Sequence, residues 1–376
     1  MAGRSLIGAE DSRMHSAGLE PATCGSVNRC SIQLSYECGA GQNTVGHPPR
    51  QADARCHRGG ITPYHEGAQR QPVRRGRCHH FPMTNSSPIL AGNVSDARLD
   101  RLLSVVSAYG TVMTAFSGGV DSTLVAAAAR RALGREAAPA ALGDSASLPR
   151  RELASARELA VALDLELIEV EPDEQNDPGY IANAGDRCYH CKSHLYGVLH
   201  DAARERGIGT IANGTNVDDL GDHRPGLMAA GEARVVSPLL EAGLAKDDVR
   251  DLARLLGLPN ADKPAAACLS SRLPFGTPVT RERLEQVEAA EEALQDLGLT
   301  GFRVRHHETV ARLEVPSDQW AAVIDPERRA RLVEAVKATG FAYVALDLEG
   351  FRSGSGNVLL TVNAQAPSVD SPRSGA

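Results

Sequence analysis

The sequence predicts an α/β protein with a doubly wound parallel sheet, followed by a small C-terminal α+β domain. Three observations lead to this fold class. Short apolar segments alternate with helix-like segments up to residue 273, a glycine-rich turn follows the first of those apolar segments, and the alternation changes after Leu273-Pro274. Strands that alternate with helices at this spacing form parallel sheets, and such sheets bind ligands at the carboxyl ends of their strands.

The elements of the larger domain, residues 83–273, follow from their periodicity. Ser95 is expected to cap a helix that runs to about Ala108, because Leu99, Leu102, Leu103 and Val106 recur on one face. Strands are then expected at 111–116, 138–143, 165–170 and 210–214, and further helices at 122–133, 149–163, 188–205 and 245–256.

The smaller domain, residues 274–363, begins with a polar helix and continues with alternating strand-like segments. The predicted order is helix 280–297, strands FRVRHH (302–307) and ARLEVP (311–316), helix 325–338 and strand YVALDLEG (343–350). The polar residues 364–376 are expected to form a disordered tail.

Composition sets limits on the class of protein. A formal net charge of −7 with 42% hydrophobic residues describes an ordinary, slightly acidic soluble protein. This balance weighs against a nucleic acid as the main partner, because proteins that bind nucleic acids usually present a basic field. The chain has no apolar run near the roughly 18 to 20 residues of a membrane span and no signal-peptide pattern. We therefore expect a cytoplasmic protein whose thiols stay reduced.

Residues 1–82 differ from the rest of the chain. They contain ten Arg and no Lys, many Gly and Pro, and no sustained apolar period. Such a segment cannot bury enough surface to offset its chain entropy. We expect a disordered extension or a mistranslated upstream region, with the working protein beginning at Met83. Five of the eight cysteines lie in this segment without paired metal-ligand spacing: Cys24, Cys30, Cys38, Cys56 and Cys78.

The motif SGGVDS (residues 117–122) provides the strongest chemical signal. Gly118 and Gly119 remove side chains, so that backbone N–H groups can close on a phosphate. Ser117 and Ser122 add hydroxyl donors, and the following helix presents the positive end of its dipole. Asp121 can hold Mg²⁺ or stabilise the turn. Val120, the remaining residue of the motif, is also expected to lie at the phosphate. The motif is not a Walker A loop, because it lacks the G-x-x-x-x-G-K-[ST] pattern.

Three further cysteines lie beyond the extension. Cys188 and Cys191 form a C-x-x-C pair at the start of a predicted helix, and Cys268 follows in a distant loop. Three thiolates can bind a [4Fe–4S] cluster with one open position, whereas zinc would need a fourth ligand such as His190 or His194. Three buried, apolar cysteines are the structural alternative.

The SGGVDS motif resembles that of the PP-loop ATP-pyrophosphatases. The resemblance implies the adenine-nucleotide alpha-hydrolase-like fold, binding of the ATP pyrophosphate by this loop, and adenylation of an acceptor oxygen. It also implies adenine binding near 142–145, which includes Asp144. The loop is common to several classes of enzyme, so it indicates the type of reaction and not the substrate.

A narrower resemblance covers roughly residues 94–362. Three segments, 213–226, 237–259 and KPAAACLSSRLPFG (263–276), together resemble the LarE-type sulfurtransferases. FRVRHH and LDLEGFRSGSGN (346–357) resemble them too.

For that family, the implied reaction uses ATP and Mg²⁺ to adenylate the carboxylates of pyridinium-3,5-biscarboxylic acid mononucleotide. Sulfur then displaces AMP, and two rounds build the sulfur ligands of the nickel-pincer nucleotide cofactor. Cys268 lies where the family places its sulfur-donating cysteine. In one branch that cysteine is consumed and becomes dehydroalanine. In another, three cysteines hold a [4Fe–4S] cluster that relays added sulfide, and Cys188 and Cys191 favour this second branch.

The resemblance also implies roles for polar residues outside the loop. Arg303 and Arg305 alternate on one face of a strand, and the family uses such arginines for substrate phosphate or carboxylate. Glu291 lies near the family's position for a metal-binding acid. Each of these residues could instead be a solvated surface group. Weaker candidates are Arg272 and Arg352 for phosphate and Asp218, Asp219 and Asp222 for nucleotide or Mg²⁺.

Rival functions remain open. A PP-loop tRNA thiolase can also use three cysteines, but it would want a basic, aromatic RNA surface, and this chain is acidic with one Trp. An amidotransferase-type synthetase would need a glutaminase domain, which we do not find in the sequence. A non-catalytic adenine-nucleotide sensor would not need Cys268. We expect a small-molecule substrate, no nucleic-acid or membrane partner, and a homo-oligomer.

Overall fold

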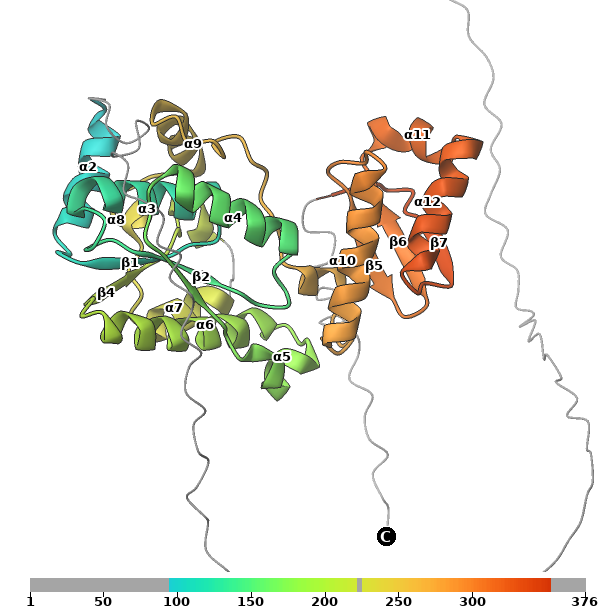
Figure 1. The fold of residues 1–376 in the computed structure, drawn as a ribbon, viewed down its shortest axis with the longest axis horizontal. Coiled ribbons are helices and arrows are strands. Elements are labelled where there is room, and N and C mark those ends of the chain that lie inside the picture. Colours follow the sequence, from blue (N-terminus) through green and yellow to red (C-terminus); the bar gives the residue numbers. More distant parts are fainter. Residues whose placement is uncertain (1–94, 222–224, 353–376) are drawn as a thin grey trace, which may run out of the picture. The chain divides into compact units, whose positions relative to one another are not determined.

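The computed structural model describes residues 95–221 and 225–352, and all of these belong to one compact unit of the chain (Figure 1). The predictions for residues 1–82 and 364–376 lie outside the described residues. No helix in the described part of the chain combines the length and apolarity that a membrane crossing requires.

A four-stranded parallel sheet forms the centre of the larger part, as the sequence predicts. Its order is β3-β2-β1-β4. The chain proceeds outward from β1 in one direction through β2 and β3, and then returns to the other side of β1 with β4. The strand order therefore reverses between β1 and β4, which is where open α/β sheets bind ligands. The strands are β1 Val112–Ala115, β2 Ala140–Gly143, β3 Leu167–Val170 and β4 Thr210–Ala212.

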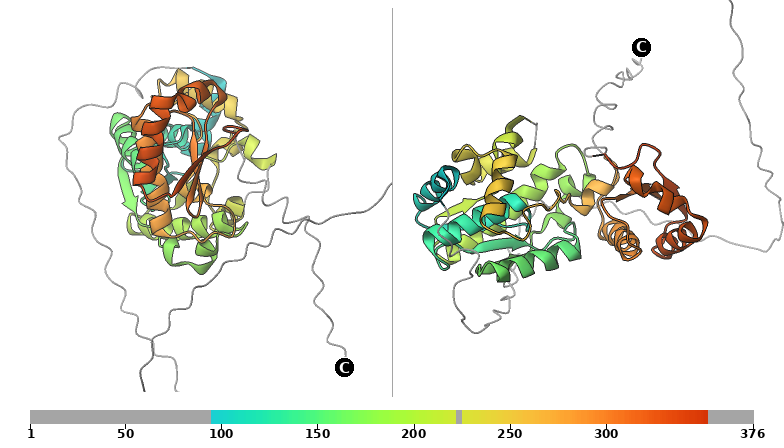
Figure 2. Two further views of the ribbon diagram at one scale, coloured as in Figure 1. Left: turned by 90° about the vertical axis from the view of Figure 1, so that its right-hand side faces the viewer. Right: turned by 90° about the horizontal axis from the view of Figure 1, so that it is seen from above.

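Helices cover both faces of this sheet (Figures 1 and 2). Side chains of a strand point alternately to its two faces, and here Val112 and Met113 enter different cores. One core lies under α2 Ala97–Ser107, α3 Val120–Leu133, α4 Arg150–Ala162, α8 Pro238–Glu241 and α9 Lys246–Leu255. The other lies under α6 Arg187–Glu205 and α7 Pro225–Glu232.

The local predictions differ from the structure at several helix ends. The cap of α2 is Asp96 and not Ser95, because the Asp96 carboxylate accepts the Arg98 N–H at 2.8 Å. Helix α3 begins at Val120, inside the SGGVDS motif, because Gly119 is the last residue with extended backbone. The sequence did not predict the shorter helices α5 Pro178–Ala182, α7, α8 and α11 Trp320–Ile324.

A second, three-stranded sheet with its own core confirms the predicted α+β region. Its order is β5-β6-β7, with β5 antiparallel and β7 parallel to β6. The boundary predicted at residues 273 and 274 stays a prediction. The elements are α10 Arg281–Asp296, β5 Arg303–His307, β6 Val310–Glu314, α11, α12 Pro326–Ala338 and β7 Tyr343–Leu346. Short 3-10 turns complete the fold: η1 Glu174–Asn176, η2 Val217–Gly221, η3 Leu269–Arg272 and η4 Ser317–Gln319.

Helix α9 allows a matched test of the core beside α3. Leu252 is fully buried, whereas Leu255 on the same helix is 44% exposed. We expect Leu252→Ala to lower the free energy of unfolding by about 2–5 kcal/mol, because it removes buried methyl groups and leaves a cavity. Leu255→Ala should change it by less than about 1 kcal/mol. Urea unfolding followed by circular dichroism measures both, and equal losses would contradict the assignment of this core.

Candidate active site

The SGGVDS turn connects β1 to α3 at the reversal of strand order. Gly118 is buried and has a φ of +72°, and a Cβ there would lie 2.9 Å from the Cβ of Ala156. The carbonyl of Gly118 accepts the Asn260 side-chain amide at 3.0 Å. Glycine is therefore required at 118 for both backbone conformation and space. By contrast, Gly119 has ordinary φ, and a Cβ there would meet only the Ser117 hydroxyl at 3.5 Å.

Hydrogen bonds within the turn orient its hydroxyl groups toward its own backbone. The Ser117 N–H donates to Ser122 Oγ at 3.2 Å, and Ser122 Oγ donates to the Gly119 carbonyl at 3.1 Å. The loop after β4 packs closely against this turn, because a Cβ at Gly214 would lie 2.7 Å from the Ser122 nitrogen. The first N–H groups of α3 thus lie between two strand ends, an arrangement suited to an anion.

Asp121 pairs with a lysine that the sequence analysis did not select. Lys246, the first residue of α9, donates from Nζ to the Asp121 carboxylate, and Asn216 Nδ2 donates to the other oxygen at 3.1 Å. The Lys246 backbone N–H also binds Asp218 Oδ2 at 2.8 Å. The turn-holding role predicted for Asp121 agrees with these contacts. Mg²⁺ prefers oxygen ligands such as the Asp121 carboxylate. Lys246 places a cation beside the same carboxylate.

The acidic loop after β4 is organised by its own backbone. The Asn216 N–H donates to Asp219 Oδ2 at 3.0 Å, and the Asp218 N–H donates to the Asn216 side chain at 3.0 Å. Asp218 and Asp219 therefore shape the wall beside Asp121. Asp222, predicted with them, lies outside the described residues.

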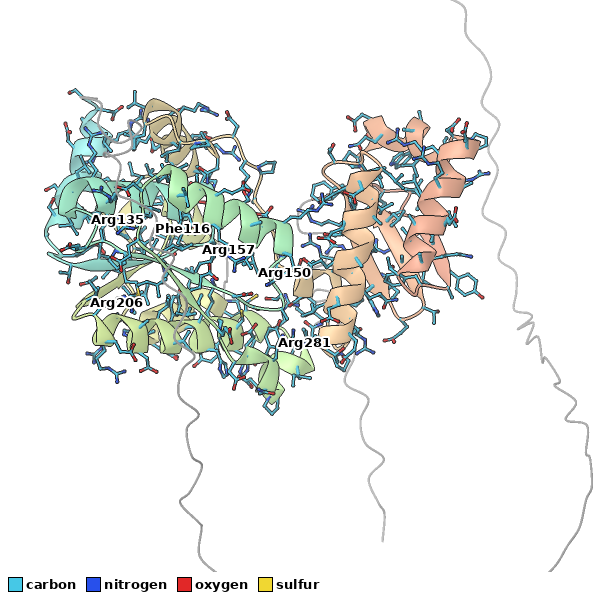
Figure 3. The ribbon with its side chains drawn as sticks, in the orientation of Figure 1. Phe116, Arg135, Arg150, Arg157, Arg206 and Arg281 are labelled. Carbon is cyan, nitrogen blue, oxygen red and sulfur yellow. The ribbon has the colours of Figure 1, made fainter. Side chains whose placement is uncertain are left out.

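The loop after β2 has a second charged pair. Asp144 forms an ion pair with Arg150 at the start of α4, a residue labelled in Figure 3. Arg150 also donates to the Leu148 carbonyl at 2.8 Å. The segment predicted to bind adenine is thus a loop held together by its own side-chain contacts. Its Ser145 hydroxyl donates to the fully buried Glu174.

The three cysteines differ in exposure. Cys188 and Cys268 are exposed, and Cys191 is half-buried. Burial raises the pKa of the Cys191 thiol to about 12, with Lys192 opposing the shift and the neighbouring thiols of Cys268 and Cys188 adding to it. Nevertheless, the described residues contain no group of three or more His, Cys, Asp or Glu side chains placed to hold a metal. The described residues therefore show no prearranged metal site at these thiols.

The two histidines proposed as a fourth zinc ligand have another partner. His190 Nδ1 lies 2.9 Å, and His194 Nε2 3.0 Å, from the same Asp177 oxygen. The other Asp177 oxygen accepts the Gly179 N–H at 2.7 Å and caps α5. These rings therefore join α6 to α5.

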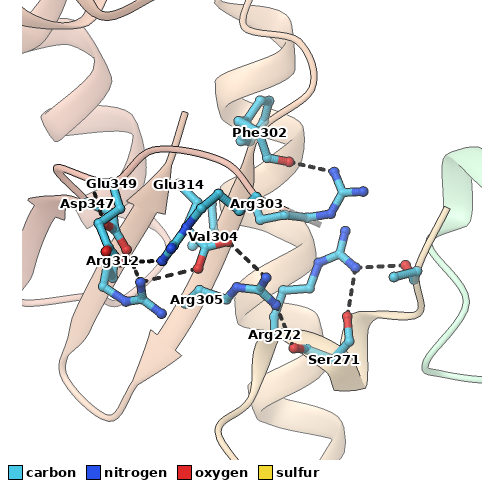
Figure 4. A network of polar contacts seen from close by, with 12 residues as sticks. Ser271, Arg272, Phe302, Arg303, Val304, Arg305, Arg312, Glu314, Asp347 and Glu349 are labelled. Atoms are coloured by element: carbon cyan, nitrogen blue, oxygen red, sulfur yellow. Dashed lines mark hydrogen bonds and ion pairs between the residues drawn. The ribbon is translucent and has the colours of Figure 1, made fainter. Parts of the chain in front are cut away.

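Glu291, predicted as a metal ligand, is the centre of a buried polar network, and Figure 4 shows its partners Arg272 and Val304. Its carboxylate accepts two hydrogen bonds from Arg272, at 2.9 and 3.0 Å, and one from the Val304 N–H at 2.9 Å. Arg272 also donates to the Cys268 carbonyl at 2.9 Å. The network thus joins the cysteine loop, α10 and β5. A carboxylate so occupied would have to release these donors before it could bind a metal.

The arginines of β5 have different partners. Arg305 donates to the buried Glu314 at 2.8 Å and to the Ser271 carbonyl at 2.7 Å. Arg303 donates to the Phe302 carbonyl at 2.7 Å and lies over the Phe351 ring at 5.1 Å. Within residues 95–221 and 225–352, no carboxylate lies at ion-pair distance from Arg303. Burial lowers the pKa of Arg303, and the neighbouring Arg272 lowers it further. Arg303 is therefore the arginine best placed to receive an anion, whereas Arg352 pairs with Glu349.

Comparison with known proteins identifies the family. No family model matches the chain. An uncharacterised protein of Synechocystis sp. is 41% identical over 266 residues, which are 71% of this chain and 99% of that protein. The pyridinium-3,5-bisthiocarboxylic acid mononucleotide synthase of Lactiplantibacillus plantarum is 39% identical over 250 residues, 66% of this chain and 90% of the synthase. The chain belongs to the LarE family.

LarE membership also places the chain among the PP-loop proteins. The tRNA-specific 2-thiouridylase of Pelobacter propionicus is 35% identical over 189 residues, 40% of this chain and 51% of the thiouridylase. The family resemblance and the fold class predicted from the sequence are therefore confirmed, and this LarE-family chain is a sulfur-transferring enzyme.

The PP-loop allows a paired glycine test. Gly118→Ala should lower the free energy of unfolding by about 1–3 kcal/mol, because alanine is strained at positive φ and would clash with Ala156. Gly119→Ala should change it by less than about 0.5 kcal/mol, since space and backbone both allow a methyl group. Urea unfolding of the two variants measures the difference, and similar stabilities would show that Gly118 is not under this constraint.

Proposed function

We propose that this enzyme uses ATP to adenylate the carboxylates of pyridinium-3,5-biscarboxylic acid mononucleotide and converts them to thiocarboxylates for the nickel-pincer nucleotide cofactor. One observation supports this most directly. The loop that exposes Cys268 is hydrogen-bonded to the arginine network, since Arg272 binds the Cys268 carbonyl at 2.9 Å and Arg305 binds the Ser271 carbonyl at 2.7 Å. A sulfur-bearing residue and an anion-binding group thus belong to one connected structure.

In this proposal the PP-loop binds the pyrophosphate of ATP. The first N–H groups of α3 and the exposed Ser117 hydroxyl would face the phosphates, while Ser122, whose hydroxyl donates to the Gly119 carbonyl, would hold the turn in shape. Lys246 balances the negative charge that develops as pyrophosphate leaves. Asp121 would hold Mg²⁺ after releasing Lys246 or Asn216 from its carboxylate, and the metal would supply further neutralisation of the phosphate oxygens. One carboxylate is a sufficient protein ligand, because Mg²⁺ usually keeps several waters and binds substrate phosphates. Asp144 lies in the loop proposed for the nucleoside.

The substrate would bind through Arg303. Its guanidinium fork fits a phosphate or carboxylate by two parallel hydrogen bonds. A substrate carboxylate oxygen attacks the α-phosphorus of ATP, the bond to pyrophosphate breaks, and an acyl adenylate forms. If added sulfide attacks the acyl carbon, AMP leaves and a thiocarboxylate remains. If the Cys268 thiolate attacks, AMP leaves and a thioester forms; loss of the Cys268 Cα proton and cleavage of its Cβ–S bond then release the thiocarboxylate and leave dehydroalanine. Arg305, already bound to Glu314, would orient the strand rather than contact the substrate.

The source of sulfur is a separate part of the proposal. A [4Fe–4S] cluster on Cys188, Cys191 and Cys268 is supported by the C-x-x-C spacing of the first two and by the family resemblance, in which three cysteines hold such a cluster. The arrangement of the described residues does not itself fit a metal, so these side chains would have to move to hold one. A sacrificial Cys268 is the alternative. The predicted cytoplasmic location and homo-oligomeric assembly remain predictions.

The deciding experiment follows pyrophosphate release from ATP by the anaerobically purified full chain. We expect release with the pyridinium biscarboxylate mononucleotide and none with bulk unmodified tRNA. Release with tRNA alone would make the chain an RNA-thiolating enzyme, a function favoured by its likeness to the 2-thiouridylase. Release with neither would favour a nucleotide sensor. Iron and acid-labile sulfide would indicate a cluster, and conversion of Cys268 to dehydroalanine after turnover would indicate the sacrificial route.

A second prediction concerns Arg303. We expect Arg303→Gln to raise KM for the mononucleotide by about 10- to 100-fold, because a charge-assisted hydrogen bond to the substrate is lost. The matched control is Arg329→Gln, on the exposed surface of α12 in the same domain. Steady-state pyrophosphate release measures both. An unchanged KM in Arg303→Gln would remove this residue from the substrate site.

A further inference from the structure

The exposed Cys268 is followed directly by two buried residues, which we call the buried base of the cysteine loop. Cys268 itself is exposed, yet Leu269 and Ser270, which follow it, are each only 1% exposed. The other two cysteines among the described residues, Cys188 and Cys191, belong to a different element, the first two turns of α6. The separation between the sulfur atoms therefore depends on how the loop is attached to that helix.

Three hydrogen bonds attach the buried base to the larger domain. The Leu269 N–H donates to the Ser147 carbonyl at 2.8 Å. The Tyr180 and Ser270 hydroxyls are 2.7 Å apart. Arg187 Nη1 donates to the Ser270 carbonyl at 2.9 Å. The first bond reaches the loop after β2, and the other two reach α5 and α6, so the cysteine loop is fixed from both sides.

Arg187 is a buried arginine without an ion-pair partner among the described residues, which is unusual for a purely structural contact. It is 6% exposed, it begins α6, and it directly precedes Cys188. Among the residues that the structure describes, no carboxylate forms an ion pair with it. Its neighbours are the Asn183 oxygen at 2.6 Å, the Ser270 carbonyl and the Phe275 ring, whose centroid is 5.8 Å away. A buried cation adds less stability than an apolar side chain of similar size, which points to a requirement for geometry.

Asn183 extends the attachment to the residues after the cysteine loop. It is fully buried with a left-handed φ of 52°, at the end of α5. Its amide donates to the carbonyls of Pro274 and Thr277 at 2.8 and 2.9 Å, while its oxygen accepts from Arg187. One side chain thus links the start of α6 to the segment that leaves the cysteine loop.

We propose that Arg187, with Asn183 and Tyr180, is a positioning clamp that sets the distance between the Cys268 sulfur and those of Cys188 and Cys191. Its consequence for sulfur transfer rests on the proposed function, whereas its consequence for the distance between thiols does not. The clamp acts through the Cys268 loop, and none of its three residues needs to touch the substrate.

The test measures how fast a short bifunctional thiol reagent, dibromobimane, bridges Cys268 to Cys188 or Cys191 in the reduced full chain without ATP. Peptide mapping identifies the bridged pair. Arg187→Gln should slow bridging by about tenfold or more, because a small misplacement of reacting groups has a large effect on rate. Arg187→Lys should fall between this variant and the parent, since an ammonium keeps the charge but not the fork. The control is Arg204→Gln, an exposed arginine on the same helix that should leave the rate unchanged.

Two further measurements separate positioning from general loss of structure. Arg187→Gln should keep pyrophosphate release with the mononucleotide and lose thiocarboxylate formation, whereas an unfolding variant would lose both. If Arg187→Gln does not fold, Tyr180→Phe decides, because it removes only the hydroxyl bonded to Ser270 and should also slow bridging. Parental bridging rates in folded Arg187→Gln or Tyr180→Phe would overturn the proposal, as would equal slowing by Arg204→Gln. The bridging result stands even if the mononucleotide is not the substrate.

Discussion

The buried ion pair between Arg272 and Glu291 is the contact on which the arrangement of the site depends. Their side chains are only 4% and 10% exposed, and two nearly parallel hydrogen bonds join them. Removing one partner of such a pair destabilises by about 3–5 kcal/mol, because the other charge is left buried and unpaired. Arg272 belongs to the cysteine loop and Glu291 to α10, so the pair fixes that loop against the second sheet.

The same carboxylate determines where Arg303, the arginine proposed to bind the substrate, lies. Glu291 also accepts the Val304 N–H, which fixes the middle of β5 against α10. Arg303 and Arg305 flank Val304, and Arg305 returns a hydrogen bond to the Ser271 carbonyl beside the cysteine. The network is consequently closed, running from the cysteine loop through α10 to β5 and back, and Figure 4 shows the link from Arg305 to Ser271. A displacement of β5 would move the cysteine loop and the anion-binding arginine together.

The sequence predicted the strands of both sheets and the longer helices well, because these elements depend on local periodicity. Alternation by two and by 3.6 is visible within ten residues, and both sheets followed from it.

The failures concern tertiary contacts. Lys246 pairs with a residue 125 positions away, and no local pattern distinguishes it from a surface lysine. Glu291 was predicted as a metal ligand from the family resemblance, and no local pattern indicates its ion pair with Arg272, 19 residues earlier. Asp96 and Ser95 are both good helix caps, so only the backbone conformation decides between them. Helix α5, with five residues, is too short to show a period.

The charge balance of the arginine network bears on which substrate the site can hold. The chain as a whole is acidic, with a net charge of −7, yet arginines gather around β5. Arg272 is paired with Glu291, and Arg305 and Arg312 both contact Glu314. Among the residues described here, Arg303 alone of these four lacks an ion-pair partner. One unpaired guanidinium suits a single phosphate or carboxylate. Binding of a long RNA depends instead on many phosphate contacts, each neutralised by its own cation. The small anionic substrate proposed above matches this single unpaired guanidinium, an argument that rests on the geometry of the network and not on overall composition.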